Sequence, residues 1–340
     1  MIITVMKFSG MNEKTMNGIK KWRVRRMLPA ALCVLLLAGC GGVDREGQTK
    51  LRNAGIAALS QQDFEGAQKD FSEAISMAKG RVTDAEIDLT YYLAASYYLQ
   101  DRYEDAEQCY SNLITYDKDN ADAFFLRGSV RLDMDESEKG LSDYRKAVAV
   151  SGDDYELYIA IYENLTALGY QKDAEPFLES ALTISGDGAD NYYYRGRIYM
   201  LLGQDDLAKT AFIKAMDKGS DEAGICLAQE YLKDSEDESA KDLISRYTAG
   251  EKKDARQSVL AGQLLLDLGE YEEALSVYEE ALKDEKTATG AYRADLLKGK
   301  IAALEYNGDF AKAKDAASDY VEEFPADAGM VRELAFLNTR

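Results

Sequence analysis

The chain has 340 residues, of which 46% are hydrophobic, and its formal net charge is −20. An acidic surface disfavours binding to nucleic acid and to anionic lipid headgroups, because both attract cationic proteins. The sequence has no His, which removes the commonest general base and metal ligand, and only three Pro, which favours helical structure.

Residues 1–39 have the features of a lipoprotein signal peptide. Five basic residues between Lys20 and Arg26 precede the apolar run 27–38, which is shorter than the roughly 20 residues that a spanning helix needs. The run ends in Leu-Ala-Gly-Cys at Cys40, which resembles a bacterial lipobox. This resemblance implies cleavage before Cys40 and a diacylglyceryl thioether on its sulfur. The alternative is an ordinary signal peptide followed by a chance Cys.

A lipidated Cys40 would determine where the protein resides. Residues 40–47 would then form the anchor and a short tether. Two or three acyl chains hold a protein firmly on a bilayer, whereas one chain holds it only marginally. We therefore expect a protein anchored by lipid to the extracytoplasmic face of a bacterial membrane.

After residue 47 the sequence repeats a pattern of two amphipathic helices joined by a short turn. The stretch Leu260–Leu282 shows it most clearly, with Gly262 and Ala274 small where the helices would meet and a turn around Gly269. Similar stretches recur at a spacing of about 34 residues and begin near residues 48, 87, 121, 155, 189, 221, 255 and 294. A lone helix pair of this size cannot bury its apolar face, so it needs neighbours of the same shape.

Small and large residues hold fixed places in these eight units. The twentieth position is always small, and its residues are Ala67, Ala106, Gly140, Ala174, Ala208, Ala240, Ala274 and Ala313. The eighth position is also small, except at Tyr162 and Ile301. The twenty-fourth is aromatic or large and apolar, except at Ala317.

This pattern resembles the tetratricopeptide repeat. The resemblance implies an all-α fold, a right-handed superhelical solenoid of about eight antiparallel helix pairs over residues 48–327, closed by a capping helix over residues 328–340. The sixth unit, residues 221–254, is the weakest match, because its turn is the acidic run Asp234–Ser239 and Tyr247 occupies a position that is usually small. We regard this unit as a candidate bend in the array.

The sequence predicts no enzyme and no metal or cofactor site. It contains no Gly-rich phosphate loop and no nucleophile elbow. Two Asp-rich runs, 117–122 and 133–135, lack the central Gly of a calcium loop and fall where Asp serves as a helix cap. Cys109 and Cys226 lie in units that do not touch in a stacked array, so we expect no disulfide between them.

The candidate partner-binding groove is a row of large apolar side chains at the fifth position of six consecutive units. Its members are Tyr91, Phe125, Ile159, Tyr193, Ile225 and Val259. The family usually turns this position towards the concave groove, where an exposed apolar strip would bind a partner. The alternative is that the row packs in the core, as aromatic stripes at helical spacing most often do. The Lys, Arg and Asn residues of the carboxylate clamp found in chaperone-cofactor members are absent.

Two functions remain open at this stage. The first is a membrane-tethered, extracytoplasmic scaffold or adaptor that binds a protein or peptide of the cell envelope through the concave face. The second is an accessory lipoprotein that binds a glycan or another small ligand in an aromatic-rich groove, since Tyr rings can stack on sugars.

Overall fold

The computed structural model describes residues 43–250, 254–284 and 287–340. The predicted signal peptide and Cys40 lie outside these ranges. All regular structure within them is α-helical. The helices are α3 (Arg45–Ser60), α4 (Phe64–Ser76), α5 (Asp84–Tyr98), α6 (Tyr103–Tyr116), α7 (Ala121–Asp133), α8 (Ser137–Ser151), α9 (Tyr155–Ala167), α10 (Gln171–Leu182), α11 (Ala189–Leu201), α12 (Asp205–Asp217), α13 (Glu222–Lys233), α14 (Asp237–Ala249), α15 (Ala255–Asp267), α16 (Tyr271–Leu282), α17 (Gly290–Tyr306), α18 (Phe310–Glu323) and α19 (Ala328–Leu337).

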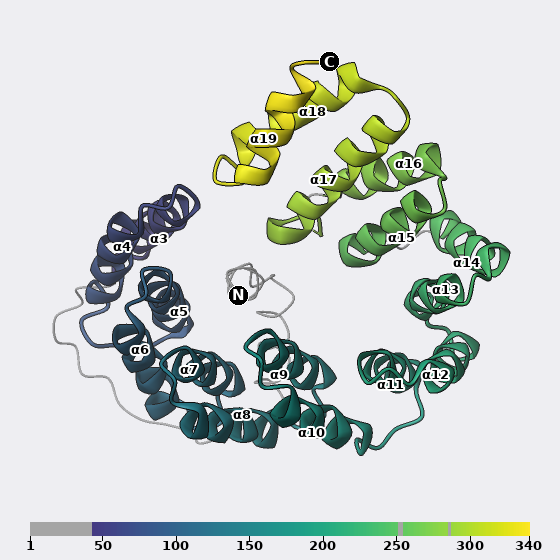
Figure 1. Ribbon diagram of the computed structural model, residues 1–340. Coiled ribbons are helices and arrows are strands. Elements are labelled where there is room, and N and C mark those ends of the chain that lie inside the picture. Colours follow the sequence, from purple (N-terminus) through teal and green to yellow (C-terminus); the bar gives the residue numbers. More distant parts are fainter. Residues whose placement is uncertain (1–42, 251–253, 285–286) are drawn as a thin grey trace, which may run out of the picture. The chain divides into compact units, whose positions relative to one another are not determined.

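The chain divides into two compact units, one ending at Ala174 and the other beginning at Glu175. In the first, α3 packs on α4, α5 on α6, and α7 on α8. In the second, the pairs are α11 with α12, α13 with α14, α15 with α16, and α17 with α18, and α19 packs on α18 (Figure 1). We call the first helix of each pair its A helix and the second its B helix. The pairs are numbered by the eight units of the sequence, so that α9 and α10 take the fourth place. The expected all-α array of helix pairs with a C-terminal helix is confirmed.

The A helices begin close to the expected starts of the units. The starts at 121, 155, 189 and 255 coincide with the first residues of α7, α9, α11 and α15, and α13 begins one residue late. Three A helices begin earlier than expected, at Arg45, Asp84 and Gly290. For two of them the cause is a side-chain cap, because Asp44 and Thr83 accept hydrogen bonds from the first turn and so extend each helix towards its N-terminus.

Each turn within a pair contains one residue in the left-handed backbone region. These residues are Gln62, Asp101, Asp135, Gly169, Gly203, Ser235, Gly269 and Gly308. A left-handed residue after the last turn of a helix lets backbone N–H groups return to its final carbonyls. In the α15–α16 turn, for example, the Gly269 N–H donates to Leu266 O and the Glu270 N–H to Leu265 O. The chain thus reverses direction without leaving backbone groups unpaired.

The core of a pair is built from a small residue on the A helix and a large ring on the B helix. A Cβ added at Gly55, Gly128, Gly196 or Gly262 would lie within 2.7 Å of the ring of Phe71, Tyr144, Phe212 or Tyr278, respectively. Close approach of the two helix backbones therefore requires glycine at these places. The last pair exchanges the two sizes, since Ile301 lies on its A helix and Ala317 on its B helix, and both are buried.

Tyr278 is enclosed by glycines from two different pairs. Its ring carbon Cζ would lie 2.4 Å from a Cβ at Gly262 on α15 and 2.3 Å from a Cβ at Gly299 on α17. The side chain is only 1% exposed. The ring therefore belongs to the interior of the seventh pair and to its contact with the eighth.

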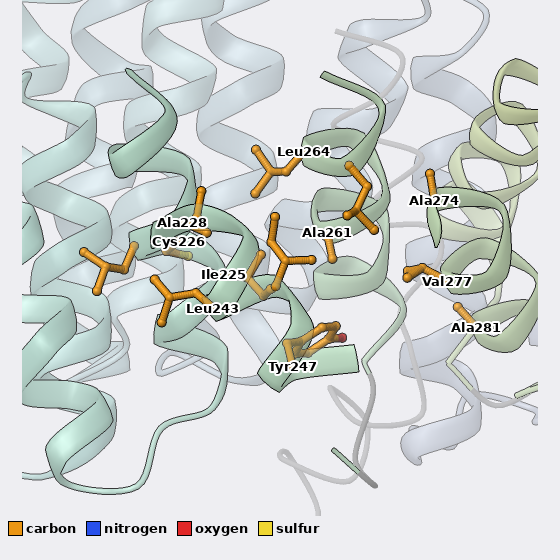
Figure 2. Packing of buried hydrophobic residues seen from close by; sticks show 14 of the residues in the cluster. Ile225, Cys226, Ala228, Leu243, Tyr247, Ala261, Leu264, Ala274, Val277 and Ala281 are labelled. Carbon is orange, nitrogen blue, oxygen red and sulfur yellow. The ribbon is translucent and has the colours of Figure 1, made fainter. Parts of the chain in front are cut away.

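The largest core cluster described in the second unit runs continuously through α13–α16. Figure 2 shows members of the cluster on all four helices: Ile225, Cys226, Ala228, Leu243, Tyr247, Ala261, Leu264, Ala274, Val277 and Ala281. Tyr247, which takes the place of the usual small residue, is 5% exposed, and its hydroxyl lies 3.2 Å from the Ser258 hydroxyl on α15. The weakest repeat by sequence therefore still has a buried core, with a polar group paired inside it.

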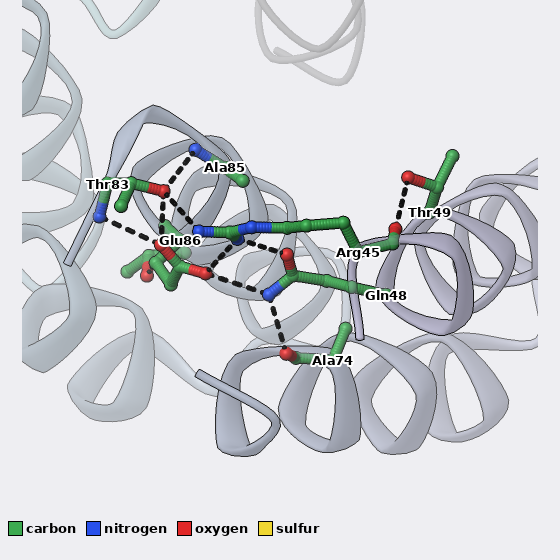
Figure 3. A network of polar contacts seen from close by, with 8 residues as sticks. Arg45, Gln48, Thr49, Ala74, Thr83, Ala85 and Glu86 are labelled. Carbon is green, nitrogen blue, oxygen red and sulfur yellow. Dashed lines mark hydrogen bonds and ion pairs between the residues drawn. The ribbon is translucent and has the colours of Figure 1, made fainter. Parts of the chain in front are cut away.

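Polar contacts tie the first pair to the second. The Glu86 carboxylate accepts hydrogen bonds from Arg45, Gln48 and Thr83 (Figure 3), and Gln48 also donates to the carbonyl of Ala74. Burial alone would raise the pKa of Glu86, but these donors outweigh it and lower the pKa to about 2. Glu86 thus holds α3 against the start of α5 as a carboxylate.

Candidate partner-binding surface

The structure places most of the fifth-position row in the core. Tyr91 is 9% exposed, Phe125 1%, Ile159 3%, Tyr193 4% and Ile225 0%, and Val259 is partly buried. Tyr193 and Ile225 belong to the core cluster of the second unit, and Val259 packs against it. Five of the six side chains are therefore not exposed as a binding strip would require. They pack in the core, which is the alternative interpretation of the row.

The contacts of two row members explain why the side chains are covered. The Tyr91 hydroxyl donates to Asn120 Oδ1 at 2.8 Å, immediately before the A helix of the next pair, and the Tyr91 ring lies 6.2 Å from that of Tyr110. Phe125 stacks on Tyr144 at 5.4 Å. The row fills space within and between helix pairs. As a result, its rings do not form an exposed surface on which a sugar could stack.

In the second unit, one hydrogen bond links the A helices of the fifth and seventh pairs. Gln257 Nε2 on α15 donates to the Tyr193 hydroxyl on α11 at 3.0 Å, although the two residues are 64 apart in sequence. The contact passes over α13, where Ala223 is fully buried and Cys226 is 6% exposed. Small side chains on α13 leave room for the residues of α11 and α15 to meet.

Gln257 has one polar atom without a partner. Its side chain is 4% exposed, and its Oε1 is a buried acceptor for which no donor is present in the described part of the chain. A buried acceptor without a donor costs about 1–3 kcal/mol. The amide therefore holds α11 and α15 together and keeps an unused acceptor between them.

Arg197 and Tyr194 lie beside the Tyr193 end of this hydrogen bond, on α11. The Arg197 guanidinium lies 5.8 Å from the ring centroid of Tyr193 and 5.6 Å from that of Tyr194, and both Arg197 and Tyr194 are partly exposed. Burial raises the pKa of the Cys226 thiol to about 11, although Arg197, Arg256 and a hydrogen bond with Tyr193 oppose the shift. The cluster thus combines cationic and aromatic groups on partly exposed side chains of the A helices.

The other residues singled out from the sequence have structural roles. Asn120 Oδ1 accepts the Ala123 N–H as the cap of α7, and Asp133 accepts the Tyr98 hydroxyl at 2.6 Å. Cys109 and Cys226 are free, buried thiols. No group of three or more Cys, Asp or Glu side chains in the described ranges is arranged to hold a metal ion.

The sequence pattern did not single out Gln257. It occupies the third position of its unit, which carries no family signal, and its partner lies two pairs away. Arg197 occupies the ninth position of its unit and lies outside the predicted row.

Comparison with known families identifies three segments as tetratricopeptide repeats. Residues 52–108 and 259–328 match one model described as tetratricopeptide repeat, and residues 189–217 match a second model with the same description. The matched segments include the whole of α4, α5, α11, α12 and α16–α18. No curated protein matches the chain.

Several solved structures are similar to the chain at low sequence identity. A tetratricopeptide repeat protein from Parabacteroides merdae ATCC 43184 is 17% identical, with a TM-score of 0.43, over 75% of this chain and 99% of that one. Yeast Tom70 is 13% identical, with a TM-score of 0.40, over 87% and 88% of the two chains. The Cut9-Hcn1 hetero-tetramer of the APC/C is 14% identical, with a TM-score of 0.44, over 79% and 53%. Proteins with tetratricopeptide repeats generally mediate protein–protein interaction.

Proposed function

We propose that the protein is a membrane-tethered, extracytoplasmic adaptor that binds a protein or peptide partner through the A helices of its second unit. The observation that carries the proposal is the hydrogen bond between Tyr193 and Gln257. It joins α11 to α15, and α13 packs against both of these helices, so we assign the partly exposed side chains of the three A helices to one surface. A surface of that length suits an extended partner better than a small molecule.

The composition of the surface indicates how a partner would be held. Tyr194 and Arg197 lie together on α11, with an aromatic ring and a guanidinium within 5.6 Å. Tyr and Arg are the residue types that most often dominate binding energy at protein interfaces. Truncation of either side chain should therefore weaken binding by about 1–2 kcal/mol.

A photo-crosslinking residue tests the location of the surface. It is placed at Tyr194, which is partly exposed on an A helix, or at Leu207, which is 49% exposed on the B helix of the same pair. In cells that make the full-length chain, position 194 should give a discrete crosslinked species that position 207 does not give. Arg197→Ala should remove that species. Identical products from both positions, or no product from position 194, would contradict the proposed surface.

The membrane tether is tested separately, at Cys40. Cys40→Ala should leave unprocessed precursor that lacks the mass of a diacylglyceryl group, as measured by mass spectrometry of the intact protein. An unchanged acylated mass in the variant would refute lipidation at Cys40. This result would leave the binding surface of the second unit untouched.

A further inference from the structure

A completely buried carboxylate lies on the A helix of the sixth pair. Glu230 on α13 is 0% exposed, and Lys233 Nζ lies 2.6 Å from its Oε1. Its Oε2 is buried without a hydrogen-bond donor in the described residues. Burying a charge is costly unless the group is both paired and hydrogen-bonded, and Glu230 meets the second condition poorly.

The charged groups near Glu230 belong to the joint between α12 and α13. Lys233 Nζ also lies 3.4 Å from Asp205 Oδ1 at the start of α12, and Lys209 on α12 pairs with Asp234 directly after α13. Glu230 is therefore balanced by one lysine, which it shares with a second carboxylate.

The joint between the sixth and seventh pairs contains an ion pair that is exposed to water, unlike that of Glu230 and Lys233. Lys241 on α14 pairs with Glu270 at 2.6 Å, at the corresponding joint between the sixth and seventh pairs, and each side chain is 36% exposed. Water can solvate that ion pair in every protonation state. Glu230 lacks this solvation, so the two joints should respond differently when their carboxyl groups lose protons.

We propose that Glu230 makes the joint between α12 and α13 sensitive to pH, so that the joint is firmest when this carboxyl group is protonated. Loss of the proton places a negative charge in a site with no exposure to water and one unsatisfied oxygen. The charge favours opening of α13, because opening returns the carboxylate to solvent. The proposal concerns the fold of the sixth pair and holds whether or not a partner binds the second unit.

The direction of the pH effect follows from the environment of the group. Burial and the neighbouring carboxyl group of Asp205 raise the pKa of Glu230, and together they outweigh Lys233, which lowers it. A group whose pKa is higher in the folded state than in the unfolded state stabilises the fold at pH values below its unfolded-state pKa. This stabilisation is lost as the pH rises through its folded-state pKa. The helix α13 should therefore open rarely from its contact with α12 in mild acid and more often at neutral and alkaline pH.

Hydrogen exchange of the α13 amides in the full mature protein tests the proposal. Exchange rates at several pH values between 4 and 8 are divided by the intrinsic chemical rates, which leaves the opening equilibrium. In the parent protein this equilibrium should increase with pH by about tenfold for each unit by which the pKa is raised. In Glu230→Gln it should be independent of pH, whereas Glu270→Gln should behave like the parent.

Two further measurements are informative even if Glu230→Gln does not fold. Lys233→Met removes the neighbouring cation and should move the opening transition to higher pH. The carbon-13 signal of the Glu230 carboxyl group should titrate above the range of an exposed Glu. Titration in the ordinary range, or the same pH response in the parent and in Glu230→Gln, would overturn the proposal.

Discussion

Replacing Gly262 by Ala should destabilise the seventh helix pair. The added Cβ would lie 2.4 Å from Tyr278 Cζ and 2.5 Å from Cε1, whereas non-bonded carbon atoms prefer about 3.5–4.0 Å. The ring would have to move by about 1 Å. Gly299 closes the other side, since a Cβ there would already lie 2.3 Å from the same ring. The ring therefore has nowhere to move without displacing α17.

The expected cost combines two opposing effects. Overpacking a core costs about 1–3 kcal/mol, and the upper end applies to Gly262 because both sides of the ring are closed. Ala is better than Gly in a helix by about 1 kcal/mol, which offsets part of that cost. The net loss in the free energy of unfolding should be about 2 kcal/mol.

Gly224→Ala is the matched control. Gly224 lies in α13, and the nearest atom to a Cβ added there is Met216 Cε at 3.7 Å, an ordinary contact. This variant should be as stable as the parent or more stable by up to about 1 kcal/mol. Urea unfolding followed by circular dichroism should rank Gly224→Ala first, the parent second and Gly262→Ala last. If Gly262→Ala were as stable as Gly224→Ala, the close packing of Tyr278 between two helices would be wrong.

Three other substitutions test separate features of the fold. Asp143→Ala removes a buried carboxylate that accepts hydrogen bonds from Arg127 at 2.8 and 2.9 Å and from Arg131 at 2.7 Å. It should cost about 3–5 kcal/mol in urea unfolding because Arg127 loses its carboxylate partner and Arg131 keeps only Glu107, and a loss below about 1 kcal/mol would contradict the network. Ser235→Gly should stabilise the protein by about 1 kcal/mol, because Ser235 has a φ of 63°, and unchanged stability would argue against that turn. Burial and the nearby Asp154 raise the pKa of Asp122 to about 6, so the ionised group lowers stability as pH rises from about 4 through 6. Asp122→Asn should match the parent near pH 4 and exceed it by about 1–3 kcal/mol near pH 7, and equal melting temperatures at both pH values would refute the shift.

The sequence predicts the helix pairs well because their signals are local. A small residue opposite a large ring, and a turn residue between two amphipathic stretches, lie within one unit of about 34 residues. Tyr162 and Ile301 depart from this pattern at the eighth position. For Ile301 the structure supplies the reason, since Ala317 opposite it is small and the volume of the pair is conserved.

The candidate surface is harder to predict because it depends on contacts between units. Periodicity shows that Tyr91 and Phe125 lie on a similar face of their helices, but it does not show how closely the next pair covers that face. Burial of the row depends on contacts such as that between Tyr91 and Asn120, which join successive pairs. The link between Tyr193 and Gln257 spans two pairs and leaves no periodic trace in the sequence.

The packing of the Tyr278 ring between the seventh and eighth pairs affects how the C-terminal part of the chain folds. A nascent chain that has emerged only as far as Leu282 has Gly262 against one side of the ring, but α17 with Gly299 is not yet there to cover the other. The seventh pair therefore lacks part of its interior until its successor is synthesised. Vectorial folding from the N-terminus should pause at this point. The seventh and eighth pairs then mature as one cooperative block, joined by an aromatic ring that both require.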